Sequence, residues 1–323
     1  MAGNNCILLL GAGFSRNWGG WLASEAFEYL LGCPEVDQAL LWKHKRRGGF
    51  EAALAELQDE HTRSAAKAPD ERLRNLQAAV LRMFADMDKA FAATNFEFQN
   101  DRAYQVALFL IRFDAIFTLN QDLLLERHYL NDNVMLNSNQ RWNGPALAGM
   151  KPAGPLTNPM ESRYLARWEP DPSNFKVPDR LQPYFKLHGS SNWVATGSDD
   201  LVVLGGNKQS VIDRYPVLKW CNAQFKAALS KPNTRLMVIG YGFGDDHINA
   251  SLRDAAGTGN MKLFVIDPLG VDVMDNNRNL QIYVPDNLAA DLWPHVIGSS
   301  RRSLREIFGG DYAEHGKVMR FFG

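Results

Sequence analysis

Cysteine is scarce in this sequence. The 323 residues include three cysteines, Cys6, Cys33 and Cys221, and none of them forms a Cys-x-x-Cys pair. Zinc ribbons and redox dithiols are built on such pairs, so the sequence excludes both. A few scattered thiols are typical of a reducing compartment, where they pack in the core.

Long hydrophobic runs are missing as well. The apolar run at residues 6–10 is too short for a signal peptide or a membrane span, and no basic segment precedes it. The sequence also contains no internal repeat and no low-complexity tract. We therefore expect a cytoplasmic globular protein that has no membrane partner.

An excess of one charge is the third absence. Lys and Arg total 35 and Asp and Glu total 36, which gives a net charge of −1. This balance excludes a global attraction to nucleic acid or to an anionic membrane, although it leaves room for a local basic patch. Hydrophobic residues make up 46% of the chain, which is typical of a well-packed globular protein.

A strand that runs into a glycine turn is the first positive feature. Four apolar residues, 7–10, lead into Gly11-Ala12-Gly13, and residues 21–30 then have a helical pattern. Glycines allow a tight turn and the close approach of a pyrophosphate, and a following helix offers N–H groups to the anion. Because the third glycine of the dinucleotide fingerprint is missing, the motif alone is equally consistent with an ordinary strand-to-helix turn.

Strands and helices alternate along most of the chain. This alternation predicts an α/β fold with a Rossmann-like, doubly wound parallel sheet that helices cover on both faces. The expected later strands are residues 114–119, 184–187, 201–204, 235–239, 262–268 and a short one near Ile282. The expected helices are residues 104–113, one from 123 onward with Asp122 as its N-cap, 217–230, one through Asp254, and two around Ala289 and Leu304.

Two segments interrupt this alternation. Residues 34–100 are predicted to be a helical insertion, which we interpret as a lid or packing module in preference to a partner-binding face. Residues 131–183 are rich in Asn, Pro and Gly, with little expected regular structure; such a long loop region is usually functional, although a surface connection is also consistent with it. The amphipathic stripe in the insertion consists of Leu73, Leu76, Val80, Phe84, Met87 and Phe91.

The carboxyl ends of the expected strands carry polar or glycine residues. In a parallel sheet, the loops at these ends converge on one crevice, which is where α/β proteins bind their ligands. The topology therefore predicts that Gly11, Asn120, His188, Gly240 and Asp267 surround one ligand.

Three motifs, taken in order, resemble the sirtuin family. They are Gly-Ala-Gly-Phe-Ser at 11–15, Thr-Leu-Asn-Gln-Asp at 118–122 and Lys-Leu-His-Gly-Ser at 186–190. The segment 240–249 resembles the bacterial sirtuin-like (Sir2-type) NADases of anti-phage defence. This resemblance implies a single sirtuin-like NAD-binding domain over residues 1–323. It also implies an enzyme that cleaves NAD+, its substrate, to nicotinamide and ADP-ribose or a cyclic form, which depletes NAD+ and halts an infected cell.

The sequence departs from the protein-deacylase sirtuins in three places. It lacks their four zinc cysteines, it has Arg16-Asn17-Trp18 in the region of their Asp-Phe-Arg motif, and Leu119 replaces the Gln before the catalytic Asn. These departures favour an NAD+ hydrolase without a zinc module and with no metal. An NAD-dependent protein deacylase and a non-catalytic sensor of NAD or ADP-ribose are the alternatives.

The resemblance assigns roles to individual residues. His188 is the candidate base, because a neutral imidazole accepts a proton near neutral pH, and Asn120 orients the ribose and the attacking water. A histidine that caps a buried turn and an asparagine that forms a turn are the structural alternatives. The expected NAD+-binding residues are Gly11, Ala12, Gly13, Phe14 and Ser15 at the diphosphate, Gly240, Tyr241 and Gly242 on the opposite side, Asp122 at the carboxamide, Asp267 at the adenosine ribose, and Asp245 and His247 lining the site. A structural role as the cap of a helix or turn is the alternative for four of these residues: Asp122, Asp245, His247 and Asp267.

Regulation is expected from outside the catalytic residues. A constitutively active NADase would kill its own cell, so the resemblance implies gating by a homo-oligomer or by a co-encoded activating partner. In related systems this partner is a HerA-type ATPase or a short Argonaute. The insertion at residues 34–100 is the expected contact surface, and the sequence gives no strong direct signal for nucleic acid.

Overall fold

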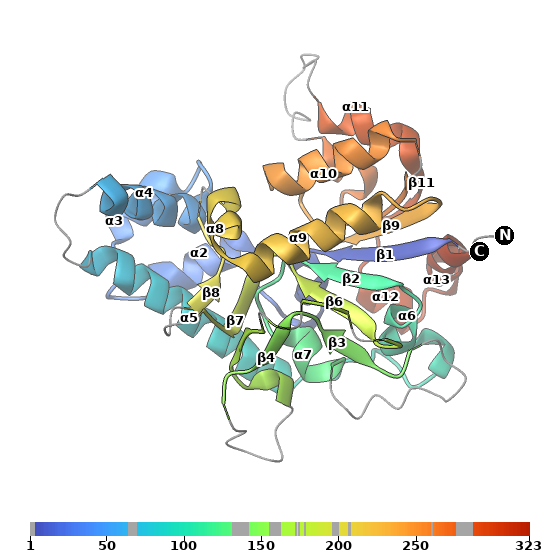
Figure 1. The fold of residues 1–323 in the computed structure, drawn as a ribbon, viewed down its shortest axis with the longest axis horizontal. Helices are drawn as coiled ribbons and strands as arrows, with labels where there is room; N and C mark the ends of the chain where they lie inside the picture. The colour runs from blue at the N-terminus through green and yellow to red at the C-terminus, as the bar shows by residue number, and fades with distance from the viewer. Residues whose placement is uncertain are drawn as a thin grey trace.

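A seven-stranded parallel sheet forms the centre of the computed structural model (Figure 1). The strand order is β11-β10-β9-β1-β2-β6-β3, and all neighbours in it are parallel. This arrangement confirms the predicted Rossmann-like sheet. The strands are β1 (Asn5–Leu10), β2 (Ala115–Thr118), β3 (Pro145–Leu147), β6 (Gln182–Lys186), β9 (Thr234–Ile239), β10 (Met261–Ile266) and β11 (Val296–Ser300).

The structure describes most, but not all, of the chain. The predicted strand near Ile282 and several parts of the loop-rich segment lie outside the described residues. The described residues are 4–63, 70–130, 142–154, 163–171, 173, 175–177, 179–195, 200–205, 208–259, 261–275 and 287–323.

The chain enters the sheet at its middle strand. From β1 it adds β2 and β6 on one side, then crosses over to add β9, β10 and β11 on the other. The direction of winding therefore reverses between β1 and β9. In open α/β sheets, the carboxyl ends of the strands at such a reversal flank a crevice that binds ligands.

The central strands are apolar along almost their whole length because helices cover both faces of the sheet. In β1, every residue from Cys6 to Leu10 is buried, and in β10 only Lys262 is exposed. The helix α9 (Pro216–Leu229) lies over one face, where it contacts β6 and β9, and α12 (Leu304–Gly309) lies behind the sheet in Figure 1. Continuous apolar strands of this kind are the pattern of a sheet buried on both sides.

Among the helices between β1 and β2, four consecutive ones, α2 to α5, group at one end of the molecule (Figure 1). The predicted amphipathic stripe is confirmed, since all six of its members are buried on α5. The longest of the four, α5, begins after Asp70, whose carboxylate accepts the N–H of Arg72. The helices are α2 (Ala23–Leu31), α3 (Gln38–His44), α4 (Gly49–Arg63) and α5 (Glu71–Ala92).

The helix predicted at residues 21–30 is confirmed as α2, but a short helix that was not predicted follows the glycine turn directly. This helix, α1, spans Ala12–Ser15, and a 3₁₀ turn spans Arg16–Trp18 before α2 starts at Ala23. Gly19 adopts a left-handed conformation, with φ of 91°, and ends the 3₁₀ turn. A side chain would be strained there, so this glycine separates the short helical segment from α2.

The segment 131–183 has more regular structure than predicted. It contains β3 and, in a second sheet of order β4-β5-β7-β8, the strands β4 (Met150–Pro152) and β5 (Trp168–Pro170). Strands of three residues are too short to show an alternating pattern, which is why the sequence did not reveal them. The second sheet is completed by β7 (Gly189–Val194) and β8 (Asp200–Val202), close to the predicted strand at 201–204.

Most of the remaining helices correspond to predicted ones, but α8 and α13 were not predicted, and the helix predicted at 104–113 is shorter than expected. The predicted helix 104–113 is helical only as α6 (Val106–Leu110), after a 3₁₀ turn, and α7 spans Leu124–His128. The others are α8 (Lys208–Arg214), α10 (Asp246–Gly257), α11 (Leu288–Leu292) and α13 (Tyr312–Met319), and the further 3₁₀ turns are Arg102–Tyr104, Arg163–Leu165, Gly270–Met274, Trp293–His295 and Arg320–Phe322.

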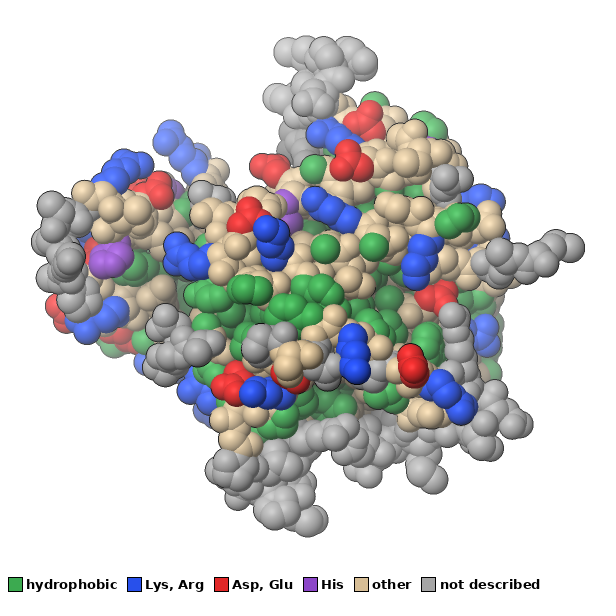
Figure 2. Space-filling view, in the orientation of Figure 1, with side chains coloured by type: hydrophobic (Ala, Val, Ile, Leu, Met, Phe, Trp, Pro, Cys, Tyr) green, Lys and Arg blue, Asp and Glu red, His purple; other side chains and the backbone are tan. Residues whose placement is uncertain are grey.

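The surface carries both charges. Figure 2 shows basic and acidic side chains interspersed over the face seen in Figure 1, as the net charge of −1 leads one to expect. Among the helices of the described residues, none combines the length and the hydropathy needed to cross a bilayer.

Candidate active site

A cleft of about 1320 Å³ opens at the carboxyl edge of the main sheet. The loops after β1, β2, β6, β9 and β10 line it on the sheet side, and α4, α5 and residues 302–305 close it on others. This volume exceeds that of most small-molecule pockets, so an extended ligand fits the space. Of the predicted site residues, the cleft wall includes Gly11, Ala12, Gly13, Asn120, Asp122, His188, Gly240, Tyr241, Gly242, Asp245 and Asp267.

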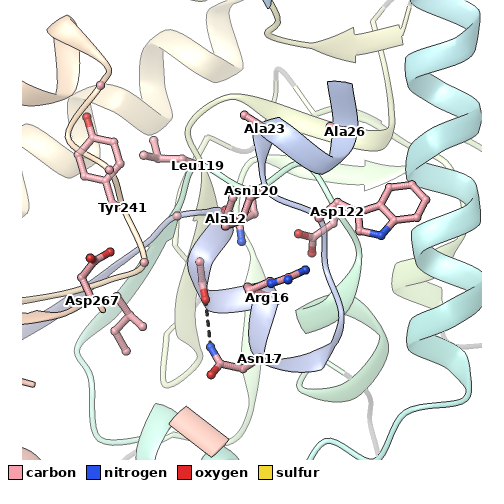
Figure 3. Close-up of a pocket in the computed structure, with 18 of the residues that line it drawn as sticks. Ala12, Arg16, Asn17, Ala23, Ala26, Leu119, Asn120, Asp122, Tyr241 and Asp267 are labelled. Atoms are coloured by element: carbon pink, nitrogen blue, oxygen red, sulfur yellow. Dashed lines mark hydrogen bonds between the residues drawn. The ribbon is translucent and has the colours of Figure 1, made fainter. Parts of the chain in front are cut away.

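The labelled residues show how the cleft is divided. In Figure 3, Ala12 and Asn120 lie next to each other at the centre. Asp122 and Arg16 face one another on one side, while Tyr241 and Asp267 lie on the opposite side. The loops of β1 and β2 therefore separate two ends of the cleft. Arg16, which departs from the sirtuin pattern, lines the cleft although the sequence did not predict it there.

Three predicted site residues do not line the cleft. Phe14 packs against Trp18 in the core, with ring centroids 5.1 Å apart, and Ser15 is buried beneath the cleft wall. His247 is half-buried at the start of α10 and reaches the site only through its contact with His188. The side chains of Phe14 and Ser15 therefore do not face the cleft and instead pack against or bond to neighbours, which are Trp18 and Asn120.

The two glycine turns pack directly on each other. The N–H of Gly13 donates to the carbonyl of Gly240 over 2.9 Å, which joins the loop after β1 to the loop after β9. A Cβ on Gly240 would lie 2.3 Å from the carbonyl carbon of Gly13, and one on Gly11 would lie 2.5 Å from the carbonyl oxygen of Gly240. The glycines at 11, 13 and 240 are thus required by loop-to-loop contact at the switch point. Gly242, by contrast, has nothing within 4 Å of an added Cβ.

Asn120 follows β2 and has a fixed orientation. Its N–H donates to Oγ1 of Thr118, and its side-chain Nδ2 donates to Oγ of Ser15, each over 3.0 Å. The hydroxyl of Ser15 also lowers the pKa of the nearby Asp122 carboxyl. This orientation leaves Oδ1 of Asn120 buried and, among the described residues, without a hydrogen-bond donor.

Asp122 combines a helix cap with a place on the cleft wall. Its carboxylate accepts the N–H of Leu124 over 3.1 Å. The N-cap itself lies one residue later than predicted, because α7 begins at Leu124 and Leu123 occupies the N-cap position. Burial raises the pKa of Asp122, and the nearby Lys186 opposes this effect. Lys186 lies beneath the loop, where Nζ donates to the Asp122 carbonyl over 2.6 Å and to Oε1 of Glu126 over 2.7 Å.

His188 lies in the turn between β6 and β7 and is almost fully buried, with 3% of its surface exposed. Burial is the main cause that lowers its pKa from the usual 6.5 to about 3, since the imidazolium would lose its hydration. Lys208 and His247 also act to lower this pKa, and the negative charge of Asp245 opposes them. The ring is therefore neutral at physiological pH and can accept a proton. Its Nε2 lies 3.1 Å from Nε2 of His247.

Asp245, the residue before α10, forms an ion pair with Lys208 that was not predicted from the sequence, and Lys208 forms a second ion pair with Glu51. Nζ of Lys208 lies 2.7 Å from Oδ1 of Asp245 and 2.9 Å from Oε2 of Glu51. Lys208 begins α8 and Glu51 belongs to α4, so this link connects the helical insertion to the cleft. Burial raises the pKa of Asp245, but its electrostatic interactions with His188 and Lys208 hold this pKa below the usual range. Charged residues on helices give no sequence signal that distinguishes such a buried link from a solvated surface.

His188, Asp245 and His247 also form a group of potential metal ligands. Their ligand atoms lie within 4.8 Å of one another. Imidazole and carboxylate groups are suitable donors for zinc or iron. In the structure, the ammonium of Lys208 already supplies a counter-charge to Asp245.

Asp267 ends β10 on the far wall of the cleft. Its N–H donates to the carbonyl of Ser300, and its Oδ1 accepts the N–H of Leu269 over 2.8 Å. The residue thus orders the turn before residues 270–274 and lines the cleft as well.

Together, the parallel sheet, the switch-point cleft and the glycine turns define a Rossmann-like nucleotide-binding protein. The family model of the SIR2-like domain matches residues 114–283, which is more than half of the chain. The chain therefore belongs to the SIR2-like domain family, whose members act on NAD+. The match begins at β2 and so leaves the glycine turn at residues 11–15 outside it. Among curated proteins, none matches the chain at a significant level.

Proposed function

We propose that this protein is an NAD+ glycohydrolase, which cleaves NAD+ to nicotinamide and ADP-ribose. The observation that carries the proposal is the pair of Asn120 and His188 in one cleft. Asn120 presents a buried oxygen that has no donor among the described residues, and His188 presents a neutral imidazole. An unpaired buried acceptor costs about 1–3 kcal/mol, which a ligand that donates a hydrogen bond recovers.

Each residue has a definite part in the proposed reaction. The bond between C1′ of the ribose and the nicotinamide nitrogen breaks, and its electron pair goes to the nicotinamide ring. Oδ1 of Asn120 accepts a hydrogen bond from a ribose hydroxyl or from the attacking water. As the water oxygen bonds to C1′, His188 removes a proton from it, and that proton is later released to solvent. Cyclisation to cyclic ADP-ribose would use a hydroxyl or ring nitrogen of the same substrate in place of water.

The proposal assigns the other parts of NAD+ to residues that line the cleft. The diphosphate lies along residues 11–13 and the loop after β9, with Gly242 open to close approach. The adenosine ribose lies at Asp267, and the carboxamide lies toward Asp122, where Figure 3 shows Arg16 facing the carboxylate.

Protein deacylation is less well supported by the same residues. Deacylase sirtuins have a four-cysteine zinc module, whereas Cys6, Cys33 and Cys221 are buried in different parts of this fold. The family resemblance further leads us to propose that the enzyme is an effector of anti-phage defence, which acts in the cytoplasm as a homo-oligomer gated by a co-encoded partner. Depletion of NAD+ would then halt the infected cell.

Chromatography of the reaction products tests this function. The purified chain is incubated with NAD+, alone and with its co-encoded partner, and nicotinamide and ADP-ribose are quantified over time. We expect equal amounts of the two products in at least one condition. NAD+ binding without release in either condition would instead identify a sensor, and release that requires an acylated peptide would identify a deacylase.

A further inference from the structure

The contact between His188 and His247 constrains the protons on both rings. Their Nε2 atoms are 3.1 Å apart, which is hydrogen-bond distance. Both rings are largely shielded from water, and burial lowers the pKa of each side chain, which favours the neutral form. A neutral imidazole has one N–H and one bare nitrogen, so the bond requires one ring to carry its proton on Nε2 and the other to carry it on Nδ1.

The second nitrogen of His188 decides which ring donates. Nδ1 of His188 makes no hydrogen bond to any residue in the described ranges, and the side chain lines the cleft. To accept a proton from a group in the cleft, Nδ1 must be bare, and the proton of the ring must then lie on Nε2. His188 is in that case the donor to His247, and His247 must present a bare Nε2.

We propose that His247 is a positioning residue that holds His188 in the Nε2–H tautomer, which leaves Nδ1 of His188 as the base of the cleft. This inference rests on the proposed hydrolysis of NAD+. In that reaction a water molecule forms the bond to C1′, the electron pair of the C1′–N bond leaves with nicotinamide, and the water proton goes to Nδ1 of His188. The resulting imidazolium then donates from Nε2 to His247 and lies beside the negative charge of Asp245 before it loses its proton to solvent.

Asp245 and its ion pair with Lys208 hold this arrangement in place. Asp245 precedes α10, the helix that carries His247 in its first turn. Lys208 ties the Asp245 carboxylate to Glu51 of α4, with distances of 2.7 and 2.9 Å. The orientation of His247 therefore depends on a contact made by the helical insertion. A ring whose hydrogen-bond partner fixes its tautomer is a recurring device in histidine catalysis.

Nitrogen NMR of the resting protein tests the proposal without any turnover. The full chain is labelled with ¹⁵N-histidine, and the two rings are assigned from the spectra of His188→Gln and His247→Gln. We expect a protonated Nε2 and a bare Nδ1 on His188, and the reverse on His247. The opposite pair of tautomers would overturn the proposal. Because the measurement needs no substrate, its outcome stays separate from whether the protein cleaves NAD+.

Two substitutions of His247 provide the kinetic arm. His247→Gln retains an oxygen that can accept from His188, whereas His247→Phe keeps a ring but offers no acceptor. We expect kcat for nicotinamide release to fall less than about tenfold in the Gln variant and about 100-fold in the Phe variant, with KM for NAD+ unchanged. His61→Phe, on the exposed side of α4, is the matched control. Equal losses in both His247 variants, or wild-type kcat in His247→Phe, would contradict the assigned role.

Discussion

The side-chain amide of Asn120 donates to the hydroxyl of Ser15 over 3.0 Å and so joins the loops after β1 and β2. Ser15 is buried, and its hydroxyl also lowers the pKa of the nearby Asp122 carboxyl. The hydroxyl of Ser15 therefore orients Asn120 on the cleft wall. This relationship separates the residues that face the ligand from those that orient them.

Replacing Ser15 should impair the reaction through its neighbours. Ser15→Ala removes the acceptor of the Asn120 amide, so the amide can rotate and Oδ1 loses its fixed direction. We expect kcat for nicotinamide release to fall about tenfold and the free energy of unfolding to fall by about 1–3 kcal/mol. Thr234→Ala is the matched control, because Thr234 is equally buried but its hydroxyl bonds to the carbonyls of Ala228 and Lys231, at the amino end of β9 and away from the cleft. An equal loss of kcat in both variants would show that the effect is one of stability alone.

The contact between the glycine turns predicts contrasting effects for two neighbouring glycines. Gly240→Ala places a Cβ 2.3 Å from the backbone of Gly13 at a φ of 62°, so we expect a loss of at least about 2–4 kcal/mol in the free energy of unfolding. Gly242→Ala meets nothing within 4 Å and should change stability by less than about 0.5 kcal/mol. Urea unfolding of both variants measures this difference, and similar stabilities would contradict the described packing.

The buried His188 predicts a pH-dependent stability. Its pKa is about 3 in the folded protein and near 6.5 when unfolded, so below pH 6.5 the unfolded chain binds a proton that the folded protein does not. Stability should therefore fall as the pH drops from 6.5, by up to about 1.4 kcal/mol per pH unit from this group. In urea titrations between pH 7 and 4.5, His188→Gln should show a shallower slope than the wild type. Identical slopes would mean that His188 is not buried in its neutral form.

The buried ion pair of Lys186 and Glu126 predicts a non-additive effect. Their side chains are 0% and 1% exposed, so Lys186→Met leaves the Glu126 carboxylate unpaired in the core. We expect this single change to cost about 3–5 kcal/mol, and the double variant Lys186→Met/Glu126→Leu to recover much of that loss. Thermal or urea unfolding of the two variants provides the comparison. A double variant less stable than the single one would contradict this view of the pair.

The sequence predicts the sheet well because β1, β9 and β10 are almost entirely apolar. Such runs are typical of strands that helices cover on both faces of a sheet. The gathering of Asn120 and His188 on one cleft follows from the same reasoning, since both residues come directly after parallel strands. The contact between Gly13 and Gly240 could not be predicted, because close packing of two loops depends on their three-dimensional path. The pairing of Lys208 with Glu51 was hidden for a similar reason, since sequence does not show which charged helix residues meet.

Nicotinamide release by Asn120→Ala and His188→Ala tests the central claim most directly. Both variants are compared with the wild type under the condition that gives the highest release, with NAD+ binding measured by calorimetry and folding by thermal denaturation. We predict that release is abolished in both variants, while the fold and NAD+ binding are retained. A folded His188→Ala protein that releases nicotinamide at a rate near that of the wild type would contradict the account.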